Sequence, residues 1–478
     1  MSTTLNRIRE VTGGTWELQP QEGDRTIARI TDDSRKVSEG DVFFALRGAY
    51  SDGHEHIPDA VHSGAQLVVA EESLAEQYQS EIGNKQAYLL VVEDSLKAFH
   101  AVARDYRLRA SNLSWVIGIT GSNGKTSVKE MIAAALERQW PGQVLKTSGN
   151  TNNHFGVPRN LLRLTSETRA AVLELGCNQR GEIAVLADIV CPDIGVITNI
   201  GQAHIENFGD QERIAREKAE LLARLPENGV AVIPYEDAYK NILHECSRAE
   251  RTLTFGTTNE ADLQVNYRGH SIAGYQVELI DNCSDQSVEF TWHVPGFYQA
   301  VNACTSAAAA KGAGLSAETA VAGLRECTLP SMRLEIARAG EVNWVNDAYN
   351  ANPESMRAGV ECFLEVTGQT PRDERRFLVL GDMLELGEQS YREHVNILKW
   401  ARQLPDCYVI ALGEQMTDAA QDVGGIVSFA EVKEACTHLK CQVRPNDWVF
   451  LKGSRKMRLE DLMTEIAFYS SDCLGKYS

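Results

Sequence analysis

The sequence has 478 residues, 43% of them hydrophobic, and a formal net charge of −19 from 66 acidic and 47 basic side chains. This length suggests about three domains, and the acidic balance excludes a broad nucleic-acid or anionic-membrane surface. The eleven cysteines are scattered and form no Cys-x-x-Cys pair, which argues against structural zinc and a disulfide framework. Because the chain has neither an apolar run of about 18 residues nor a hydrophobic N-terminal segment, we expect no transmembrane helix and no secretory signal, and we predict a cytoplasmic protein.

The first 110 residues mix short strands with helices. β-Branched and apolar content predicts strands at 27–33, 42–46, 66–70 and 88–92, and helices are expected at 57–63 and 95–109. We take residues 1–110 as one domain.

From residue 114 onward, strands and helices alternate regularly. We expect strands at 115–120, 170–175, 195–199 and 230–234, and helices at 127–139, 157–164, 181–187 and 211–225. This alternation predicts an α/β domain with a mostly parallel, doubly wound sheet. Residues 252–294 alternate with a period of two and predict an antiparallel insert, and the alanine-rich segment 300–312 predicts a helix. The domain is expected to span 111–328.

The alternation begins again beyond residue 328. Strands are expected at 342–347, 377–381, 407–412, 425–429 and 448–452, with helices between them. We therefore expect a third domain, also α/β, over 329–478.

The most informative segment is Ile119-Thr-Gly-Ser-Asn-Gly-Lys-Thr126, between a predicted strand and a predicted helix. Glycines let backbone N–H groups turn inward toward phosphates, and the helix N-terminus adds positive dipole. Lys125 would reach the β- and γ-phosphates, and the Thr126 hydroxyl would ligate Mg²⁺. The common phosphate-loop pattern needs a glycine at the position of Ile119, so this is either a variant loop or a glycine turn followed by an exposed lysine.

Two polar residues follow other predicted strands of the same domain. Glu174 ends the apolar run 170–175, where an open α/β sheet binds ligands, and a carboxylate there suits Mg²⁺. His204 follows the strand at 195–199 and is a candidate metal ligand. The alternatives are a solvated carboxylate and a structural histidine.

Further polar segments lie along the central and third domains. The loop 147–158 is dense in amides and hydroxyls and could hydrogen-bond a polar substrate. Lys218 lies in the predicted helix 211–225, and its spacing alone predicts a solvated lysine. In the third domain, Asp347 could bond a ribose hydroxyl, and the cationic loop at 452–455 suits a carboxylate or phosphate. A polar loop at a strand end is the alternative for both.

Together these motifs resemble the ATP-dependent Mur ligases of peptidoglycan synthesis, over nearly the whole chain. The variant loop 120–126, the segment 150–158, Glu174 and the His204 loop occur in the family's order, followed by Arg333 and the Asp347 loop. The resemblance implies a small N-terminal α/β domain for a UDP-linked substrate, a central P-loop-like ATPase domain, and a C-terminal Rossmann-like domain. It also implies a monomer.

Two features are similar to the branch that adds the terminal dipeptide. These are Asn346-Asp-Ala-Tyr-Asn-Ala-Asn-Pro-Glu-Ser-Met356 and Gly381-Asp-Met-Leu-Glu-Leu-Gly387, whereas the Asp-Asn-Pro-Arg motif of the diaminopimelate-adding branch is absent. The implied substrates are UDP-N-acetylmuramoyl (UDP-MurNAc) tripeptide, D-alanyl-D-alanine and ATP. The third residue of the tripeptide, diaminopimelate or lysine, stays open.

The resemblance implies a set of binding residues. For ATP these are Gly121, Ser122, Asn123, Gly124, Lys125, Thr126, Ser127, Asn302, Arg333 and Asp347. For the UDP substrate they are Ser34, Arg35, Phe44, Ala45, Gly48, Asp52, Gly53, His54, Asn150, Asn152 and Asn153. The polar residues Asn350, Asn352, Lys452, Ser454 and Arg455 are candidates without an assigned role.

The resemblance also changes the interpretation of Lys218, which matches a lysine that is carbamoylated in several Mur ligases. We therefore expect one Mg²⁺ on Thr126 and Glu174 and a second on His204 and carbamoylated Lys218. Lys125, Lys218 and His204 are the expected catalytic residues.

One segment departs from the family pattern, because Tyr298 and Gln299 replace its His-Asn pair while Asn302 is kept. Several alternatives stay open. They are a sister ligase that adds one amino acid, a folylpolyglutamate synthase, a P-loop kinase and a non-catalytic nucleotide sensor.

Overall fold

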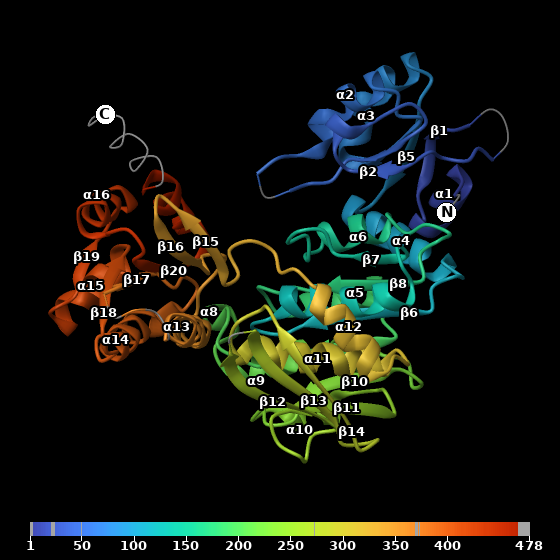
Figure 1. Ribbon diagram of the computed structural model, residues 1–478. Helices are drawn as coiled ribbons and strands as arrows, with labels where there is room; N and C mark the ends of the chain where they lie inside the picture. The colour runs from blue at the N-terminus through green and yellow to red at the C-terminus, as the bar shows by residue number, and fades with distance from the viewer. Residues whose placement is uncertain are drawn as a thin grey trace, which may run out of the picture.

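The computed structural model describes residues 3–20, 24–48, 50–271, 273–368, 371 and 373–466. Three sheets form the centres of three α/β units, and the N-terminal and C-terminal units lie on different sides of the central one (Figure 1). None of the helices in these ranges is long and apolar enough to cross a membrane. The expected three-part α/β architecture is confirmed.

The N-terminal unit has a sheet in the order β1-β5-β4-β3-β2, in which only β1 is antiparallel. Its strands are β1 (Thr15–Leu18), β2 (Ile30–Thr31), β3 (Val42–Phe44), β4 (Leu67–Glu71) and β5 (Tyr88–Val92), and its helices are α1 (Leu5–Thr12), α2 (Ile57–His62), α3 (Glu72–Asn84) and α4 (Ser95–Arg109), with 3-10 turns η1 (Ser34–Lys36) and η2 (Gly53–His56). Sequence analysis did not predict α1, α3 or β1. The strand predicted at 27–33 is wrong except at Ile30–Thr31, because the Asp33 carboxylate accepts the Arg35 N–H and starts η1.

Helix α4 joins the N-terminal unit to the central unit. It packs against α1 on one side and against α6 (Gly156–Leu161) and α7 (Glu182–Val190) of the central unit on the other. Arg159 of α6 reaches back to Asp32, with 2.5 Å between Nη2 and Oδ2. These contacts connect the N-terminal unit to one face of the central sheet.

The central sheet has the order β14-β13-β12-β11-β10-β9-β6-β8-β7. Its strands are β6 (Trp115–Thr120), β7 (Val144–Lys146), β8 (Ala170–Glu174), β9 (Ile194–Ile197), β10 (Val230–Pro234), β11 (Arg251–Gly256), β12 (Leu263–Ser271), β13 (Gly274–Asp281) and β14 (Gln286–Trp292), and its other helices are α5 (Lys125–Gln139), α8 (Ile205–Phe208), α9 (Gln211–Ala219), η3 (Leu222–Arg224), α10 (Lys240–Cys246), α11 (Phe297–Gly312) and α12 (Ala317–Glu326). The parallel sheet predicted for this unit is confirmed.

Two details of this unit differ from the sequence prediction. The antiparallel segment expected over 252–294 begins only where β13 pairs with β12, because β11 and β12 continue the parallel sheet. The helix expected over 211–225 ends at Ala219, after which a turn leads into η3. Leu221, Leu222 and Leu225 are buried in this turn, so apolar burial continues after the helix has ended.

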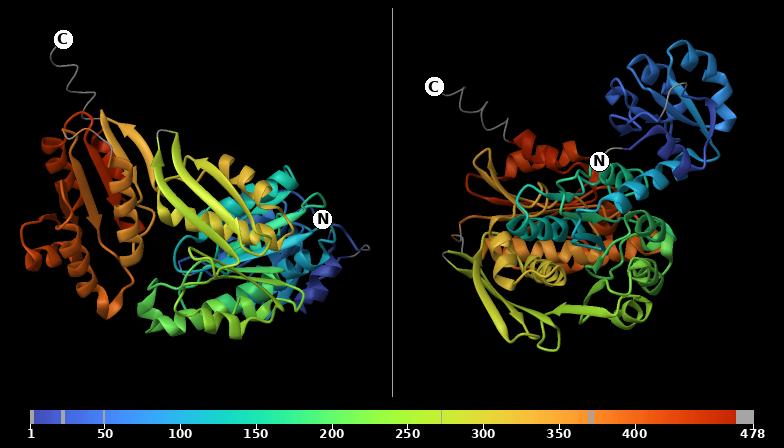
Figure 2. Two further views of the ribbon diagram at one scale, coloured as in Figure 1. Left: turned by 60° about the horizontal axis from the view of Figure 1, so that its bottom comes forward. Right: turned by 90° about the vertical axis from the view of Figure 1, so that its right-hand side faces the viewer.

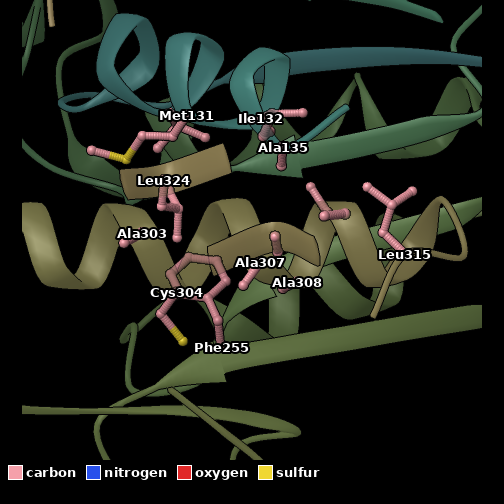
Figure 3. Packing of buried hydrophobic residues seen from close by; sticks show 14 of the residues in the cluster. Met131, Ile132, Ala135, Phe255, Ala303, Cys304, Ala307, Ala308, Leu315 and Leu324 are labelled. Atoms are coloured by element: carbon pink, nitrogen blue, oxygen red, sulfur yellow. The ribbon is translucent and has the colours of Figure 1, made fainter. Parts of the chain in front are cut away.

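Helix α11 packs between α5, α12 and the sheet (Figure 3). Its run of small residues allows this close approach. Cys304 and Ala308 are fully buried, and Phe255 of β11 is 1% exposed. On the other face of the sheet, α6, α7 and α9 cover a second core cluster. The two packed faces hold the strand ends of the central sheet in fixed positions.

The C-terminal unit has a sheet in the order β15-β16-β20-β17-β18-β19, in which only β15 is antiparallel. Its strands are β15 (Glu335–Ala339), β16 (Val342–Asn346), β17 (Arg376–Gly381), β18 (Cys407–Leu412), β19 (Val427–Phe429) and β20 (Trp448–Lys452), and its helices are α13 (Pro353–Thr367), η4 (Gly387–Gln389), α14 (Ser390–Ala401), α15 (Glu414–Val423), α16 (Val432–Gln442) and η5 (Arg455–Met457). Strand β12 of the central unit contacts α13 of the C-terminal unit, and the ribbons of the two units approach each other there (Figure 2). At this contact Tyr267 Oη lies 2.5 Å from Glu365 Oε1.

Candidate active site

The loop after β6 occupies the carboxyl end of the central sheet, where ligands bind in open α/β folds. Its backbone leaves no room for side chains at two positions. A Cβ on Gly121 would lie 1.9 Å from Thr198 Oγ1, and a Cβ on Gly124 would lie 2.6 Å from Asn302 Oδ1. Gly124 also has a left-handed backbone, with φ of 80°, as the N-cap of α5. The glycines of the loop are therefore required by close packing as well as by the turn.

Neighbouring strand ends fix this loop. The Asn123 N–H donates to Asn199 Oδ1 at 2.9 Å, and the Gly201 N–H donates to Ser122 Oγ at 2.8 Å. Both partners follow β9, which pairs with β6. The shape of the loop is thus set by the adjacent strand.

A buried carboxylate lies directly below the loop. The Thr126 hydroxyl donates to Glu174 Oε2 at 2.9 Å, and Asn152 Nδ2 donates to Oε1 of the same carboxylate at 2.8 Å. Glu174 is only 2% exposed, so the solvated alternative is wrong. Two oxygen donors of the kind that Mg²⁺ prefers converge here.

Lys125 is directed back onto the loop. Its Nζ donates to Gly121 O at 2.7 Å and to Ser122 O at 3.2 Å. Burial, followed by repulsion from Lys218, lowers the pKa of Lys125 to about 8. An incoming phosphate would counteract both effects, because its negative charge favours the protonated ammonium.

Lys218 is buried, so the solvated-helix interpretation is wrong. Lys218 is 3% exposed, and its Nζ lies 3.8 Å from Cys177 Sγ. An amphipathic pattern could not show this, because the burial comes from the packing of α9 against α7. Lys218 does not itself line the cavity, but Cys177 beside it does. Burying an ammonium beside a thiol is costly unless another group compensates the charge.

His204 is the N-cap of α8 and lines a cavity that Lys125 and Glu174 also line. Its side chain is 21% exposed, and its Nδ1 lies 2.6 Å from Oε2 of Glu385, a residue of the C-terminal unit. The histidine therefore lies where two units meet.

The C-terminal unit also brings cations to the loop. Arg333 Nη2 donates to Thr126 Oγ1 at 2.9 Å, and its guanidinium lies 4.0 Å from the ring centroid of Tyr349. Lys452 Nζ lies 2.5 Å from Asp347 Oδ2 and donates to Asn350 O at 3.1 Å. Arg333 of the C-terminal unit thus contacts the Thr126 hydroxyl of the central unit.

An amide links the loop to helix α13. Asn352 Nδ2 donates to Asn123 Oδ1 at 2.7 Å, and Asn123 Nδ2 donates to Glu354 Oε2 at 3.3 Å. Asn352 is also the N-cap of α13 in a capping box with Ser355. Both ends of the Asn123 amide are therefore held by the C-terminal unit.

The segment that departs from the family pattern has a defined geometry. Gln299 Oε1 accepts from Asn302 Nδ2 at 3.0 Å, which orients the Asn302 amide toward Gly124. Tyr298 is 51% exposed and lines the cavity. Gln299 thus supports Asn302 from within α11.

One cavity of about 1290 Å³ collects many of the expected residues. Those that line it are Ser122, Asn123, Gly124, Lys125, Thr126, Ser127, Asn150, Asn152, Asn153, Glu174, His204, Asn302, Arg333, Asp347, Asn350, Asn352 and Lys452. They come from the central and C-terminal units, and α4 of the N-terminal unit adds Lys97 and His100.

The predicted UDP-binding residues of the N-terminal unit lie elsewhere. Phe44, Ala45 and His54 are buried in its interior, and Gly53 donates its N–H to Leu46 O at 2.8 Å. The others, Ser34, Arg35, Gly48 and Asp52, are partly or fully exposed on the same unit. In the C-terminal unit, Ser454 Oγ accepts the Leu384 N–H and Arg455 pairs with Glu460, so neither contributes to the lining.

Sequence reasoning missed several groups at the site, notably Asn199, Glu354 and Glu385. Asn199 directly follows a buried strand, and Glu354 lies in the first turn of a proline-started helix, so strand-end and helix-start signals pointed to both. Glu385 also follows a predicted strand, within the motif 381–387, but that pattern could not indicate its partner, because only the approach of two units brings it to His204.

Three family models match consecutive parts of the chain. The Mur ligase family, catalytic domain, matches residues 26–107, the Mur ligase middle domain matches 119–310, and the Mur ligase, glutamate ligase domain, matches 332–455. With the phosphate loop and its buried carboxylate, these matches define the class: the chain belongs to the Mur ligase family.

The relatives identify one branch of this family. A UDP-N-acetylmuramoyl-tripeptide–D-alanyl-D-alanine ligase of Bacillus subtilis is 30% identical over 97% of this chain and 98% of its own length. The crystal structure I of MurF from Acinetobacter baumannii matches with a TM-score of 0.87 and 30% identity, covering 98% of this chain and 99% of that one. MurF ligase from Thermotoga maritima in complex with ADP matches with a TM-score of 0.79 and 27% identity, covering 93% and 98%.

Proposed function

We propose that this protein is an ATP-dependent ligase that joins D-alanyl-D-alanine to the terminal carboxylate of UDP-MurNAc-tripeptide, producing the pentapeptide precursor of peptidoglycan. The observation that carries the proposal is the single cavity in which the phosphate loop, the Asn150–Asn153 amides and Arg333 meet. Full-length similarity to ligases of this name supports the choice of substrates.

The first chemical step brings two anions together. The tripeptide carboxylate attacks the γ-phosphate of ATP and forms an acyl phosphate and ADP. Repulsion between two charges about 4 Å apart is roughly 4 kcal/mol at an effective dielectric near 20. Lys125, Arg333 and the loop N–H groups would counter this repulsion by the electrostatic logic common to phosphoryl transfer.

The second step forms the amide. The free amine of the dipeptide attacks the acyl carbon, and phosphate leaves. The cavity lies between units, so their approach would exclude water from the acyl phosphate and complete the site at the same time. Asn302 of the central unit and Asp347 of the C-terminal unit are proposed to contact the nucleotide.

The residues present fit Mg²⁺ at the loop. Thr126 and Glu174 supply converging oxygens, and among the described residues no three His, Cys, Asp or Glu side chains form a complete cage. A small number of protein ligands suits Mg²⁺, which usually keeps several waters and substrate phosphates in its coordination shell. When bound, Mg²⁺ would supply positive charge for the transferring phosphoryl group.

Lys218 is proposed to act as a carbamate. Carbamoylation replaces a buried cation by an anion with two oxygens, which removes its repulsion with Lys125 and creates a ligand for a second Mg²⁺ together with His204. The burial of Lys218 with Cys177 as its neighbour supports this proposal.

The three units are proposed as functional domains over 1–110, 111–328 and 329–478. The first would bind the UDP moiety through Ser34, Arg35, Phe44, Ala45, Gly48, Asp52, Gly53 and His54, aided by Asn150, Asn152 and Asn153. Because Phe44, Ala45 and His54 are buried, their contribution would be to shape the surface rather than to contact ligand. A cytoplasmic monomer is part of the same proposal.

The deciding experiment measures phosphate release by purified protein with ATP, Mg²⁺ and UDP-MurNAc-tripeptide, with and without D-alanyl-D-alanine. We expect release that depends on the dipeptide and a UDP-linked pentapeptide in the mass spectrum. Release that responds to a single amino acid would instead identify a sister ligase. Absence of release with every pairing would contradict the proposal.

A further inference from the structure

Two residues with left-handed backbones face each other across the boundary between the central and C-terminal units. His204 has φ of 59° and Glu385 has φ of 67°. Neither is a glycine, and such conformations cost on the order of 1 kcal/mol or more and persist only where the surrounding structure holds them. His204 lines the cavity and Glu385 contacts it from the neighbouring unit, so these two backbone conformations point to a specific task for the pair.

The contact leaves one nitrogen of the imidazole for the cavity. Nδ1 of His204 is buried and lies 2.6 Å from Glu385 Oε2, in a contact whose angle departs from that of an ideal hydrogen bond. The ring itself lines the cavity. Nε2 is therefore the nitrogen that remains available to a ligand.

The backbone around Glu385 is docked onto α8. A Cβ on Gly387 would lie 2.8 Å from the Glu206 Cβ, so the segments that contain Gly387 and Glu206 are in close contact. Helix α8 and η4 are in contact, and Figure 1 shows α8 at the boundary with the C-terminal unit. The Glu385 carboxylate consequently reaches His204 only when the two units are together.

We propose that Glu385 is a positioning residue that holds the His204 imidazole from the neighbouring unit, so that Nε2 is presented to the Mg²⁺-nucleotide only in the docked arrangement. A histidine that serves a metal commonly gives its other ring nitrogen to a carboxylate, which fixes the tautomer and orientation of the ring. Here the carboxylate comes from another unit, which couples docking to completion of the site. The inference rests on the proposed function.

Binding of ADP by calorimetry, with Mg²⁺ and separately with EDTA, tests this directly. Glu385→Gln should weaken ADP binding roughly tenfold in Mg²⁺ and leave binding in EDTA unchanged. The matched control is Glu388→Gln, which removes the same charge from an exposed position in the same loop and should match the wild type in both conditions. Equal weakening with and without Mg²⁺, or no weakening, would overturn the inference.

A double-mutant cycle separates positioning from a general structural effect. In a His204→Asn background, Glu385→Gln should cause no further loss of Mg²⁺-dependent binding, because the carboxylate has nothing left to orient. Additive losses would contradict the proposed coupling. If Glu385→Gln fails to fold, Glu385→Asn replaces it, since asparagine tolerates the left-handed backbone.

The kinetic signature distinguishes this inference from the function on which it rests. Glu385→Gln should lower kcat about 10–100-fold while the KM for UDP-MurNAc-tripeptide stays the same. If wild-type protein binds Mg²⁺-ADP but shows no dipeptide-dependent phosphate release, the proposed function fails, and the binding data still decide the role of Glu385.

Discussion

The phosphate loop after β6 and the segment that follows β3 both place polar groups just beyond a parallel strand, but they direct them differently. Lys125 and Thr126 face the cavity and approach Glu174 and Arg333. His54, by contrast, is 1% exposed, with Nδ1 2.6 Å from Asp52 Oδ1 and Nε2 accepting the Glu71 N–H at 3.1 Å. The first set of polar groups is arranged for a ligand, whereas the second joins the parts of its own unit.

This contrast shows that a motif residue can be required for two different reasons. At the loop, Gly121 and Gly124 are required because a side chain there would clash with Thr198 and Asn302, whereas Lys125 and Thr126 line the cavity and are available for chemistry. Around His54, the imidazole satisfies backbone groups that would otherwise be buried without partners. Substitutions should therefore change turnover in the first region and stability in the second.

The largest expected effect follows Lys125→Ala. Removing the cation nearest the transferring phosphate should lower kcat on the order of 10³-fold, with a thermal melting temperature close to that of the wild type. Steady-state phosphate release and a melting curve measure the two quantities. Lys146→Ala, an exposed lysine beyond the site, is the control, and an unchanged kcat in Lys125→Ala would remove the phosphate-loop assignment.

Lys218→Ala should lower kcat somewhat less, by about 10²-fold, because one ligand of a second Mg²⁺ is lost. Added formate or acetate should restore part of the activity by supplying a small carboxylate to the vacated volume. Arg216→Ala, on the exposed side of α9, should behave as wild type. Full activity of Lys218→Ala without rescue would contradict a carbamate at this position.

His54→Ala tests the other side of the comparison. It removes a buried ring and leaves the Glu71 N–H without its acceptor, so the free energy of unfolding should fall by about 2–4 kcal/mol. Denaturant titration measures this, and kcat below the unfolding transition should stay near that of the wild type. The exposed His56→Ala is the matched control, and a fall in kcat without a loss of stability would make His54 a site residue.

The same contrast explains what sequence could predict. The phosphate loop, Glu174 and the parallel order of β6, β8 and β9 could be predicted from local pattern. Apolar strand ends and the glycines of the loop are visible in a few consecutive residues, and each requires a particular local geometry. The burial of Lys218 and the pairing of His204 with Glu385 depend on how separate elements pack. Helix spacing gave the wrong environment for Lys218 for this reason, and only resemblance to a family corrected it.

The smallest expected effect concerns Arg35, which is exposed and pairs with Asp33 at 2.8 Å. Hydrogen bonding to Arg35 is the main cause that lowers the pKa of Asp33 from 3.8 to about 2. Because the folded-state pKa is lowered, the associated stability is present above pH 3.8 and is lost as the pH falls through about 2. Its size is small, since the guanidinium is in solvent and the pair is screened by water and salt.

Arg35→Ala should therefore raise the pKa of Asp33 toward its usual value, which an NMR titration of the carboxyl carbon measures, and leave stability at neutral pH nearly unchanged. If Arg35 meets the UDP moiety, the same variant should raise the KM for UDP-MurNAc-tripeptide roughly tenfold, the loss expected for one charge-assisted hydrogen bond, and leave the KM for ATP alone. A change in the KM for ATP would place Arg35 in communication with the phosphate loop and contradict a separate role for the N-terminal unit in binding the UDP moiety.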